Sequence, residues 1–255
     1  MSIAIPLDWL TGFGLALTRL IGAFLYAPVF GHAVVPARVR LMIALALAFW
    51  LSSGLSVDPG APGFSLGFAL LREATIGLAI GFAASLVFTG FALMGEYAAM
   101  QGGLGAAAVL DPSTGNNSVV LTSLVGVLAG LAFLAIEGHH DVLRGLVLSF
   151  EALPVGGAGP DVFGFVQLAQ LGSVIFEVGV KLAAPFTAVM LVSNVAVGIL
   201  GRAIPQLNLM SIQLPAQIGL TLLILGLAAG PFVDEIGAVL RTELPRAVTV
   251  LWETP

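Results

Sequence analysis

The residues best suited to chemistry lie together in the stretch IEGHHDVLRGL, where Glu137 and Asp141 flank His139 and His140. Zinc sites on helices use histidines four residues apart, whereas adjacent helical residues point about 100° away from each other. The alternative is a polar helix end at which Asp141 pairs with Arg144, three residues later. The spacing favours this ion pair over a metal site.

Other kinds of catalytic site find no support in the sequence. The chain has no cysteine, which excludes disulfides, thiolate metal ligands and cysteine nucleophiles. No stretch matches the nucleotide-binding pattern G-x-x-x-x-G-K-[ST]. The sequence therefore predicts a protein that is not an enzyme and that holds no metal or cofactor.

Two basic residues lie inside apolar stretches, where an ionisable group is costly and marks a transport pathway or a buried partner. Lys181 follows Glu177 by four residues, an order that favours an ion pair along one helix face over a proton or ion relay. Arg19 has no acidic residue three or four positions away. It therefore requires a partner from another helix, another chain or water.

The elements that carry these residues are apolar enough for a membrane. Of the 255 residues, 58% are hydrophobic and 9% are charged, against roughly 25% charged in a soluble domain. The net charge of -5, without a run of Lys or Arg, argues against nucleic acid as a partner. A helix needs about 20 apolar residues to cross the hydrocarbon. The apolar intervals predict six helices, at residues 9–26, 41–57, 74–95, 119–136, 182–201 and 214–233.

Charge does not decide how these helices are oriented. If all six helices span the membrane, three arginines lie in loops on one side, and four lie in loops or in the C-terminal tail on the other, so the positive-inside rule gives no direction. The first group is Arg38, Arg40 and Arg202, and the second is Arg72, Arg144, Arg241 and Arg246. This balance weakly favours helices that do not simply cross a membrane one after another.

Small residues inside the apolar intervals predict close helix packing. The pattern G-x-x-x-G occurs at Gly77 and Gly81 and again at Gly126 and Gly130. Glycines at this spacing let two helix backbones approach each other. Ordinary packing between helices is favoured over a dimerisation role.

Five stretches occur in an order that is specific to one family. They are RLIGAFLYAPVFGHAVVPARVRLMIALAL (19–47), LREATIGLAIGF (71–82), GEYAAMQGGLGAAAVLDPSTG (95–115), FLAIEGHHDVLRGLVLSFEALPVG (133–156) and KLAAPFTAVMLVSNVAVGILGRAIPQLNLMSI (181–212). In this order they resemble the FliR family of flagellar type III export-gate subunits and their injectisome counterparts, the SctT proteins. The resemblance implies an all-α, polytopic membrane protein with about six long apolar helices, arranged as bent hairpins within a larger helical assembly.

The same resemblance implies a structural, pore-forming role in the export gate. Family members assemble with FliP and FliQ and pass unfolded export substrates across the bacterial inner membrane, at the flagellar basal body. The resemblance further implies contact with membrane lipid, with much of the chain on the periplasmic side of the membrane plane. An injectisome gate subunit and a secondary transporter stay open as alternatives. The transporter would use Lys181, Pro185 and Asn194 at a broken helix.

The resemblance also implies a division of the chain into two domains, a loop that plugs the pore, and a set of residues that contact other subunits. Residues 1–160 are expected to be FliP-like and residues 161–255 to form a FliQ-like hairpin, whose turn contacts a homologue of FlhB. A loop that plugs the pore is expected to contain Gly102, Gly103, Gly105, Ala106, Asp111, Pro112, Gly115 and Asn117. Subunit or partner contacts are expected from Arg19, Arg72, Glu73, Glu177, Lys181, Arg202, Pro205, Gln206 and Asn208.

Overall fold

The computed structural model describes residues 7–31, 35–54, 66–103, 120–156, 165–203 and 209–249. Within these ranges the regular structure is entirely α-helical, which confirms the predicted all-α class. The helices are α1 (Leu7–Tyr26), α2 (Ala37–Ser52), α3 (Leu66–Gln101), α5 (Val120–Ala135), α6 (Gly138–Ala152), α7 (Phe165–Ala203) and α8 (Leu209–Thr249).

Each of the six predicted apolar intervals coincides with a helix, but three helices are much longer than predicted. α3, α7 and α8 contain 36, 39 and 41 residues, so they continue beyond their apolar cores into segments with charged side chains. Arg72 therefore lies in α3, and Arg241 and Arg246 lie in α8. Arg38 and Arg40 lie in α2, and Arg202 lies in α7. The prediction that placed these six arginines in loops or in the C-terminal tail was wrong.

α6 lies where the sequence analysis predicted a loop containing Arg144. Its buried face includes Val142, Leu146 and Phe150, which follow one another at intervals of four residues, as expected for one side of a helix. Charged residues interrupt the apolar run, and an interval count therefore misses the helix.

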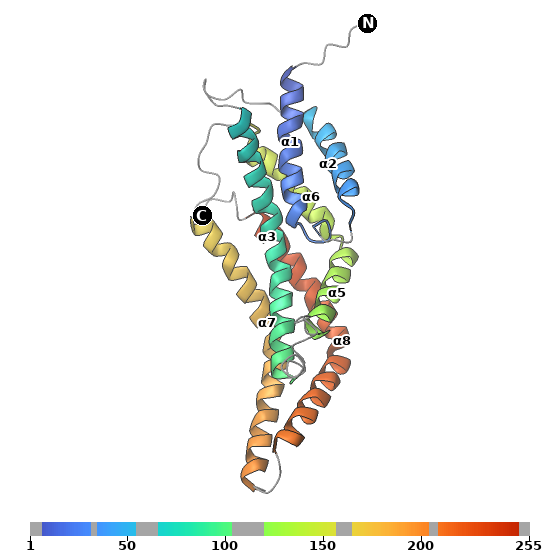
Figure 1. Ribbon diagram of the computed structural model, residues 1–255, viewed down its shortest axis with the longest axis vertical. Helices are drawn as coiled ribbons and strands as arrows, with labels where there is room; N and C mark the ends of the chain where they lie inside the picture. Colours follow the sequence, from blue (N-terminus) through green and yellow to red (C-terminus); the bar gives the residue numbers. More distant parts are fainter. Residues whose placement is uncertain are drawn as a thin grey trace, which may run out of the picture. The chain divides into compact units, whose positions relative to one another are not determined.

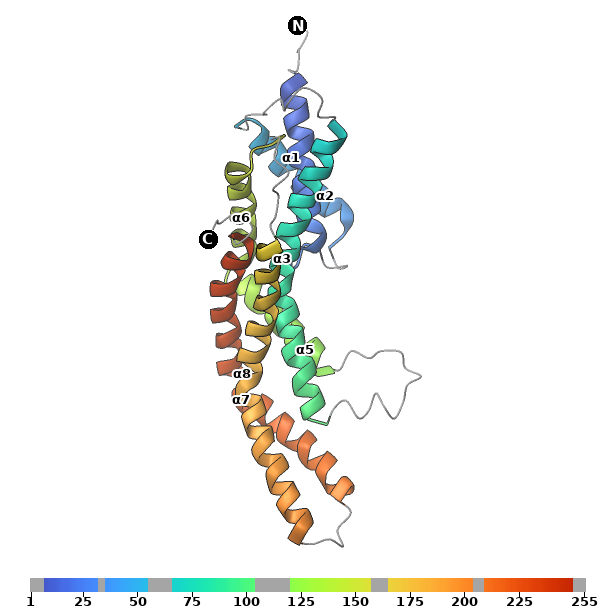
Figure 2. The same cartoon turned by 90° about the vertical axis from the view of Figure 1, so that its left-hand side faces the viewer.

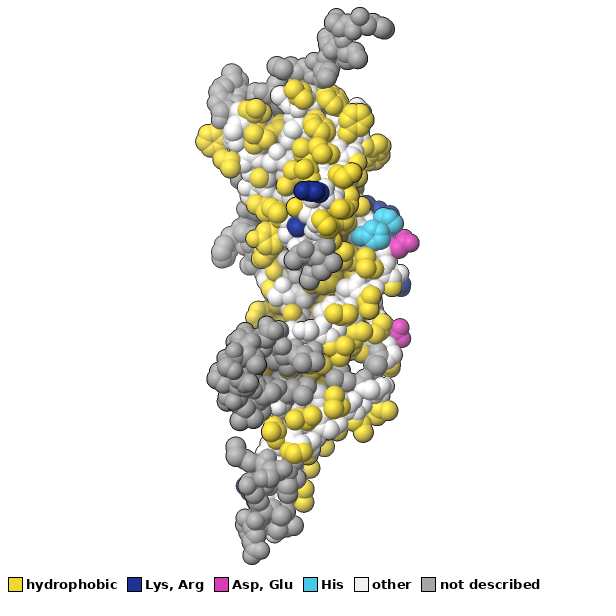
Figure 3. Space-filling model, turned by 45° about the vertical axis from the view of Figure 1, so that its right-hand side comes forward, with side chains coloured by type: hydrophobic (Ala, Val, Ile, Leu, Met, Phe, Trp, Pro, Cys, Tyr) yellow, Lys and Arg dark blue, Asp and Glu magenta, His cyan; other side chains and the backbone are white. Residues whose placement is uncertain are grey.

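Three of the described helices are long and apolar enough to cross a membrane: Trp9–Tyr26 of α1, all of α3, and Gly172–Ala203 of α7. A fourth is added if α5 and α6 together form one broken span. Large apolar side chains are widely exposed, and Figure 3 shows hydrophobic groups over much of one face. An apolar surface of this extent requires lipid or protein to cover it.

The described helices pack into two compact units, each assembled from segments distant in sequence. The first unit comprises residues 1–87, 137–173 and 241–255, and the second comprises residues 88–136 and 174–240. These units are clusters in space, whereas the predicted division at residue 160 is a boundary in the sequence. That division stays a prediction.

In the first unit, α1 lies beside α2 and beside the first part of α3 (Figure 1). A Cβ atom on Gly77 would collide with the backbone carbonyl of Arg19, and one on Gly81 with that of Ala23. The first G-x-x-x-G pair thus serves close packing between two helices of the same chain, as predicted. By contrast, a Cβ on Gly126 or Gly130 of α5 would meet open space.

In the second unit, the later part of α7 and the first part of α8 form a long hairpin (Figure 2). Asn194 of α7 and Gln217 of α8 lie at similar distances from the turn, and Gln217 Nε2 donates a hydrogen bond to Asn194 Oδ1 at 2.9 Å. α7 continues through Pro185 without interruption. The broken helix that the transporter hypothesis requires at this proline is therefore not found.

Candidate functional site

The first unit buries an ion pair between two of its helices. Arg19 of α1 and Glu73 of α3 expose none of their side chains, and Arg19 Nε donates a hydrogen bond to Glu73 Oε2 at 2.6 Å. The partner that Arg19 requires is thus supplied by another helix of the same chain. Direct hydrogen bonding between opposite charges is what makes full burial of an arginine and a glutamate tolerable.

The remaining nitrogens of Arg19 bind the C-terminal end of α6. Nη1 donates to the Ser149 carbonyl and Nη2 to the Leu153 carbonyl, both at 2.8 Å. The Ser149 carbonyl also accepts the Leu153 N–H at 2.9 Å, whereas the Leu153 carbonyl lies past the last turn, where carbonyl groups lack partners within the helix. Both lie at the negative end of the helix dipole, which favours a guanidinium group there. The centre of the Phe150 ring lies 4.2 Å from Arg19 Cζ, which adds a cation–π contact.

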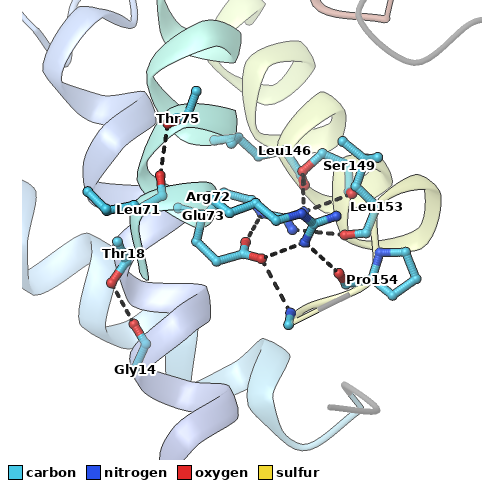
Figure 4. A network of polar contacts seen from close by, with 12 residues as sticks. Gly14, Thr18, Leu71, Arg72, Glu73, Thr75, Leu146, Ser149, Leu153 and Pro154 are labelled. Atoms are coloured by element: carbon cyan, nitrogen blue, oxygen red, sulfur yellow. Dashed lines mark hydrogen bonds and ion pairs between the residues drawn. The ribbon is translucent and has the colours of Figure 1, made fainter. Parts of the chain in front are cut away.

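The second oxygen of Glu73 extends the cluster to the turn that follows α6. Glu73 Oε1 lies 3.2 Å from Arg72 Nη1. The Gly156 N–H donates a hydrogen bond to the same oxygen, Glu73 Oε1, at 3.4 Å. Arg72 Nη1 also donates to the Pro154 carbonyl at 3.2 Å. Figure 4 shows Arg72 and Glu73 facing Leu153 and Pro154. This buried ion cluster, centred on Arg19 and Glu73, therefore joins α1, α3, α6 and the turn after α6.

The buried ion cluster is suited to holding helices together rather than to a reaction. Both oxygens of Glu73 accept hydrogen bonds, and Arg19 donates to the carboxylate and to two helix-end carbonyls. Arg19 and Glu73 are thus satisfied by the protein itself, whereas Arg72 Nε is buried without a hydrogen-bond partner among the described residues. Among the described residues, no group of three His, Asp or Glu side chains could hold a metal ion.

The residues of the buried ion cluster, which were predicted to contact other subunits, have little or no exposed side-chain surface. Arg19 and Glu73 expose no side-chain surface, and Arg72 exposes 10% of its side chain. The contacts of these three residues described above are all made within the chain. Their effect on a neighbouring subunit would therefore be exerted through the helices that they position.

The predicted contact residues of α7 have surface available. Glu177, Lys181 and Arg202 are all exposed. Contact of these residues with another subunit stays a prediction, as does the ion pair between Glu177 and Lys181. α7 ends at Ala203 and α8 begins at Leu209, so the predicted turn falls between them. Its residues Pro205, Gln206 and Asn208 lie outside the described residues.

The predicted plug loop begins at the end of α3, in the second unit. Gly102 and Gly103 follow the helix directly, and Gly103 has a φ of +73°, a left-handed conformation typical of glycine after a helix. A Cβ on Gly102 would collide with the Thr221 side chain of α8, and one on Gly103 would lie 3.2 Å from Gln217 Oε1. The start of the loop therefore packs directly on α8. The other predicted plug residues, Gly105, Ala106, Asp111, Pro112, Gly115 and Asn117, lie outside the described residues.

The histidine pair lies at the start of α6, where the sequence predicts a polar helix end. Arg144 Nη1 lies 3.8 Å from Asp141 Oδ1, which confirms the predicted ion pair. Glu137 precedes the helix and lies 3.2 Å from His140 Nδ1. Both members of this second pair are mostly exposed, so the pair contributes little to stability.

Sequence reasoning did not find the residues that complete these sites. Ser149 and Leu153 take part through backbone carbonyl groups, which leave no trace in residue type. Gln217 and Thr221 were recognisable as polar residues in an apolar stretch, but no spacing rule connects them to Gly102. These contacts join residues that are distant in sequence.

Long apolar helices, two of them joined by the buried ion pair between Arg19 and Glu73, define a helical membrane protein. The chain matches the bacterial export proteins, family 1, over residues 10–242. It is 34% identical to the flagellar biosynthetic protein FliR of Escherichia coli (strain K12), covering 82% of this chain and 80% of that protein. Identity to FliR of Bacillus subtilis (strain 168) is 30%, over 86% of each chain.

A third relative, FliR of Pectobacterium carotovorum subsp. carotovorum, is 29% identical over 90% of this chain and 89% of its own length. The protein therefore belongs to the bacterial export proteins, family 1, and is a membrane subunit of a flagellar type III export apparatus.

Proposed function

We propose that this chain is a pore-forming structural subunit of the flagellar export gate. In this proposal it assembles with homologues of FliP and FliQ in the inner membrane at the basal body, and unfolded export substrates pass through the assembly. The exposed apolar faces of its helices support the proposal, because they require neighbouring helices or lipid as a cover. The buried ion cluster supports it as well, because it fixes three helices relative to one another without any contribution from a neighbour.

The packing of Gly102 and Gly103 against α8 is the observation that carries the proposed plug. A loop that closes a pore must be fixed at its root, so that its remainder occupies the same place in every molecule. Gly102 packs on Thr221, and Gly103 turns the chain with a positive φ. The glycines and alanines that follow in the sequence are small enough for a narrow pore and permit a compliant backbone.

The turn between α7 and α8 is the proposed contact with an FlhB homologue. Arg202 is exposed one residue before the end of α7, where it can reach a partner. In this proposal the turn lies at the cytoplasmic mouth of the gate, and much of the remaining chain lies on the periplasmic side of the membrane plane.

A secondary transporter is not favoured by the geometry. A central site would bring together the side chains of Lys181, Pro185 and Asn194. Instead, α7 continues through Pro185, both Lys181 and Pro185 are exposed, and Asn194 is hydrogen-bonded to Gln217.

Deletion of Gly105–Ala108 tests the proposed plug. We expect leakage of ions and small solutes through the membrane to rise several-fold, while the complex still assembles, because the shortened loop no longer fills the pore. The measurement is dye uptake in cells in which co-purification proves that the complex is present. A variant that keeps the loop length, with Ala106→Ser and Ala108→Ser, serves as control. Leakage equal to that of the intact gate would contradict the proposal.

A further inference from the structure

A cavity of about 220 Å³ lies in the first unit, between the last turns of α1 and the first turns of α2. Its walls are almost entirely apolar. They are formed by Ile21, Phe24, Leu25, Ala37, Arg40 and Leu41. A single cationic side chain thus borders an otherwise hydrophobic space.

Arg40 is not satisfied at this position. Its Nε is buried from solvent and has no hydrogen-bond partner among the described residues. A buried donor without an acceptor is unfavourable, so an occupant that accepts hydrogen bonds would be favoured beside Arg40. Arg38, two residues earlier on α2, is exposed and adds a second positive charge near the same end of the helix.

The surroundings of the two arginines indicate how an occupant would lie. The residues of α1 that line the cavity, Ile21 to Leu25, belong to the last turns of the candidate span Trp9–Tyr26. The end of a span is the depth at which lipid phosphates lie. From there α2 exposes Met42, Phe49 and Trp50, which are 69%, 64% and 67% exposed. An apolar path therefore continues along α2, away from the charged end.

We propose that the α1–α2 cavity binds one anionic phospholipid. Its phosphate accepts hydrogen bonds from the guanidinium group of Arg40, whose fork is suited to a phosphate, and the charge of Arg38 at the same helix end attracts the anion. One acyl chain enters the cavity beside Leu25 and Leu41 and continues over the exposed face of α2. A partner helix bearing a carboxylate is the competing occupant. Lipid is favoured because the charge lies at the end of a span and the apolar surface runs on from it. This inference does not depend on the proposed pore.

Native mass spectrometry of the full chain in mild detergent tests this proposal. The protein is mixed with phosphatidylglycerol or with zwitterionic phosphatidylcholine of the same chain length, and the lipid-bound fraction is measured. We expect phosphatidylglycerol to be retained and Arg40→Gln to reduce its retention roughly fivefold, the effect of one arginine near an anionic lipid. The matched control is Arg144→Gln, which removes an arginine that is 75% exposed on α6 and should leave retention unchanged.

Ala37→Phe provides a second variant, because it fills the cavity while both arginines remain. It should also reduce retention of phosphatidylglycerol, and circular dichroism shows whether each variant is folded. Three results would overturn the proposal: equal retention by Arg40→Gln and the control, equal retention of both lipids, or displacement of the lipid by the FliP and FliQ homologues. Competition by inorganic phosphate alone would identify a simple anion site and overturn it too.

Discussion

Single residues in this protein show how a charge becomes compatible with an apolar helix. Arg19 lies in the middle of a candidate span, where an unpaired guanidinium would be strongly unfavourable. Glu73 neutralises it, and the carbonyl groups of Ser149 and Leu153 take up its other donors. A charge that is costly alone thus becomes the point at which three helices meet.

Glu73→Gln should destabilise the isolated chain by about 3–5 kcal/mol, the usual cost of leaving one partner of a buried ion pair uncompensated. The reason is that Arg19 keeps its charge and its burial but loses the opposite charge 2.6 Å away. Thermal unfolding in detergent, followed by circular dichroism, measures the loss.

Glu151→Gln is the matched control for this substitution, since Glu151 is an exposed glutamate on α6. It should change the free energy of unfolding by no more than about 0.5 kcal/mol. Replacing Arg19 and Glu73 together by methionine should recover part of the loss, because the fully buried Arg19 charge is removed with its partner and Arg72 keeps the Pro154 carbonyl as an acceptor. Equal stability of Glu73→Gln and Glu151→Gln would show that the cluster does not hold the unit together.

Among the elements, the contact between the end of α3 and α8 matters most for the proposed gate. Thr221 is fully buried, and its hydroxyl donates a hydrogen bond to the Gln217 carbonyl one turn earlier. Its side chain therefore has a fixed position, against which Gly102 packs. The absence of a side chain at residue 102 sets how closely α3 approaches α8 where the proposed plug begins.

Gly102→Ala should displace the root of the loop and raise ion leakage through the assembled gate, because the added methyl group collides with Thr221. Thr221→Ala, combined with it, should restore low leakage by removing the atoms that collide. Conductance of the purified complex in planar bilayers measures the effect. Gly126→Ala is the control, since a Cβ there meets open space. If the double variant leaks as much as Gly102→Ala, the contact does not position the loop.

At the scale of the whole molecule, the apolar surface shows that the chain does not function alone in water. Large side chains such as Leu227 on α8, which is 77% exposed, require a hydrophobic cover. The family relationship makes other components of the export apparatus the expected cover.

Co-expression with the FliP and FliQ homologues of the same organism should yield a stable mixed complex that contains this chain. Without them the chain should run as a heterogeneous species, because its apolar faces lack a defined partner. Native mass spectrometry after extraction in mild detergent distinguishes the two states. A monodisperse monomer or homo-oligomer that ignores both partners would contradict the proposed assembly.

Much of the fold follows from the sequence, because the cost of burying charge in hydrocarbon is a property of each residue in its own stretch. The apolar intervals therefore locate six helices and show that Arg19 requires a partner. The ends of α3, α7 and α8 were wrong, since packing within the protein lets a helix continue past its apolar core. α6 and its Arg144 were assigned to a loop for another reason, since charged residues interrupt the apolar run of that helix.

The sequence by itself determined a helical membrane protein of the export family, since composition and the order of its stretches are properties of the chain. Only the tertiary structure decided that Arg19 pairs with Glu73, and that Gly102 rests on Thr221 of α8. The physical reason is that each of these contacts joins residues separated by more than 50 positions. Their spacing in sequence carries no information about distance, which the packing of entire helices sets.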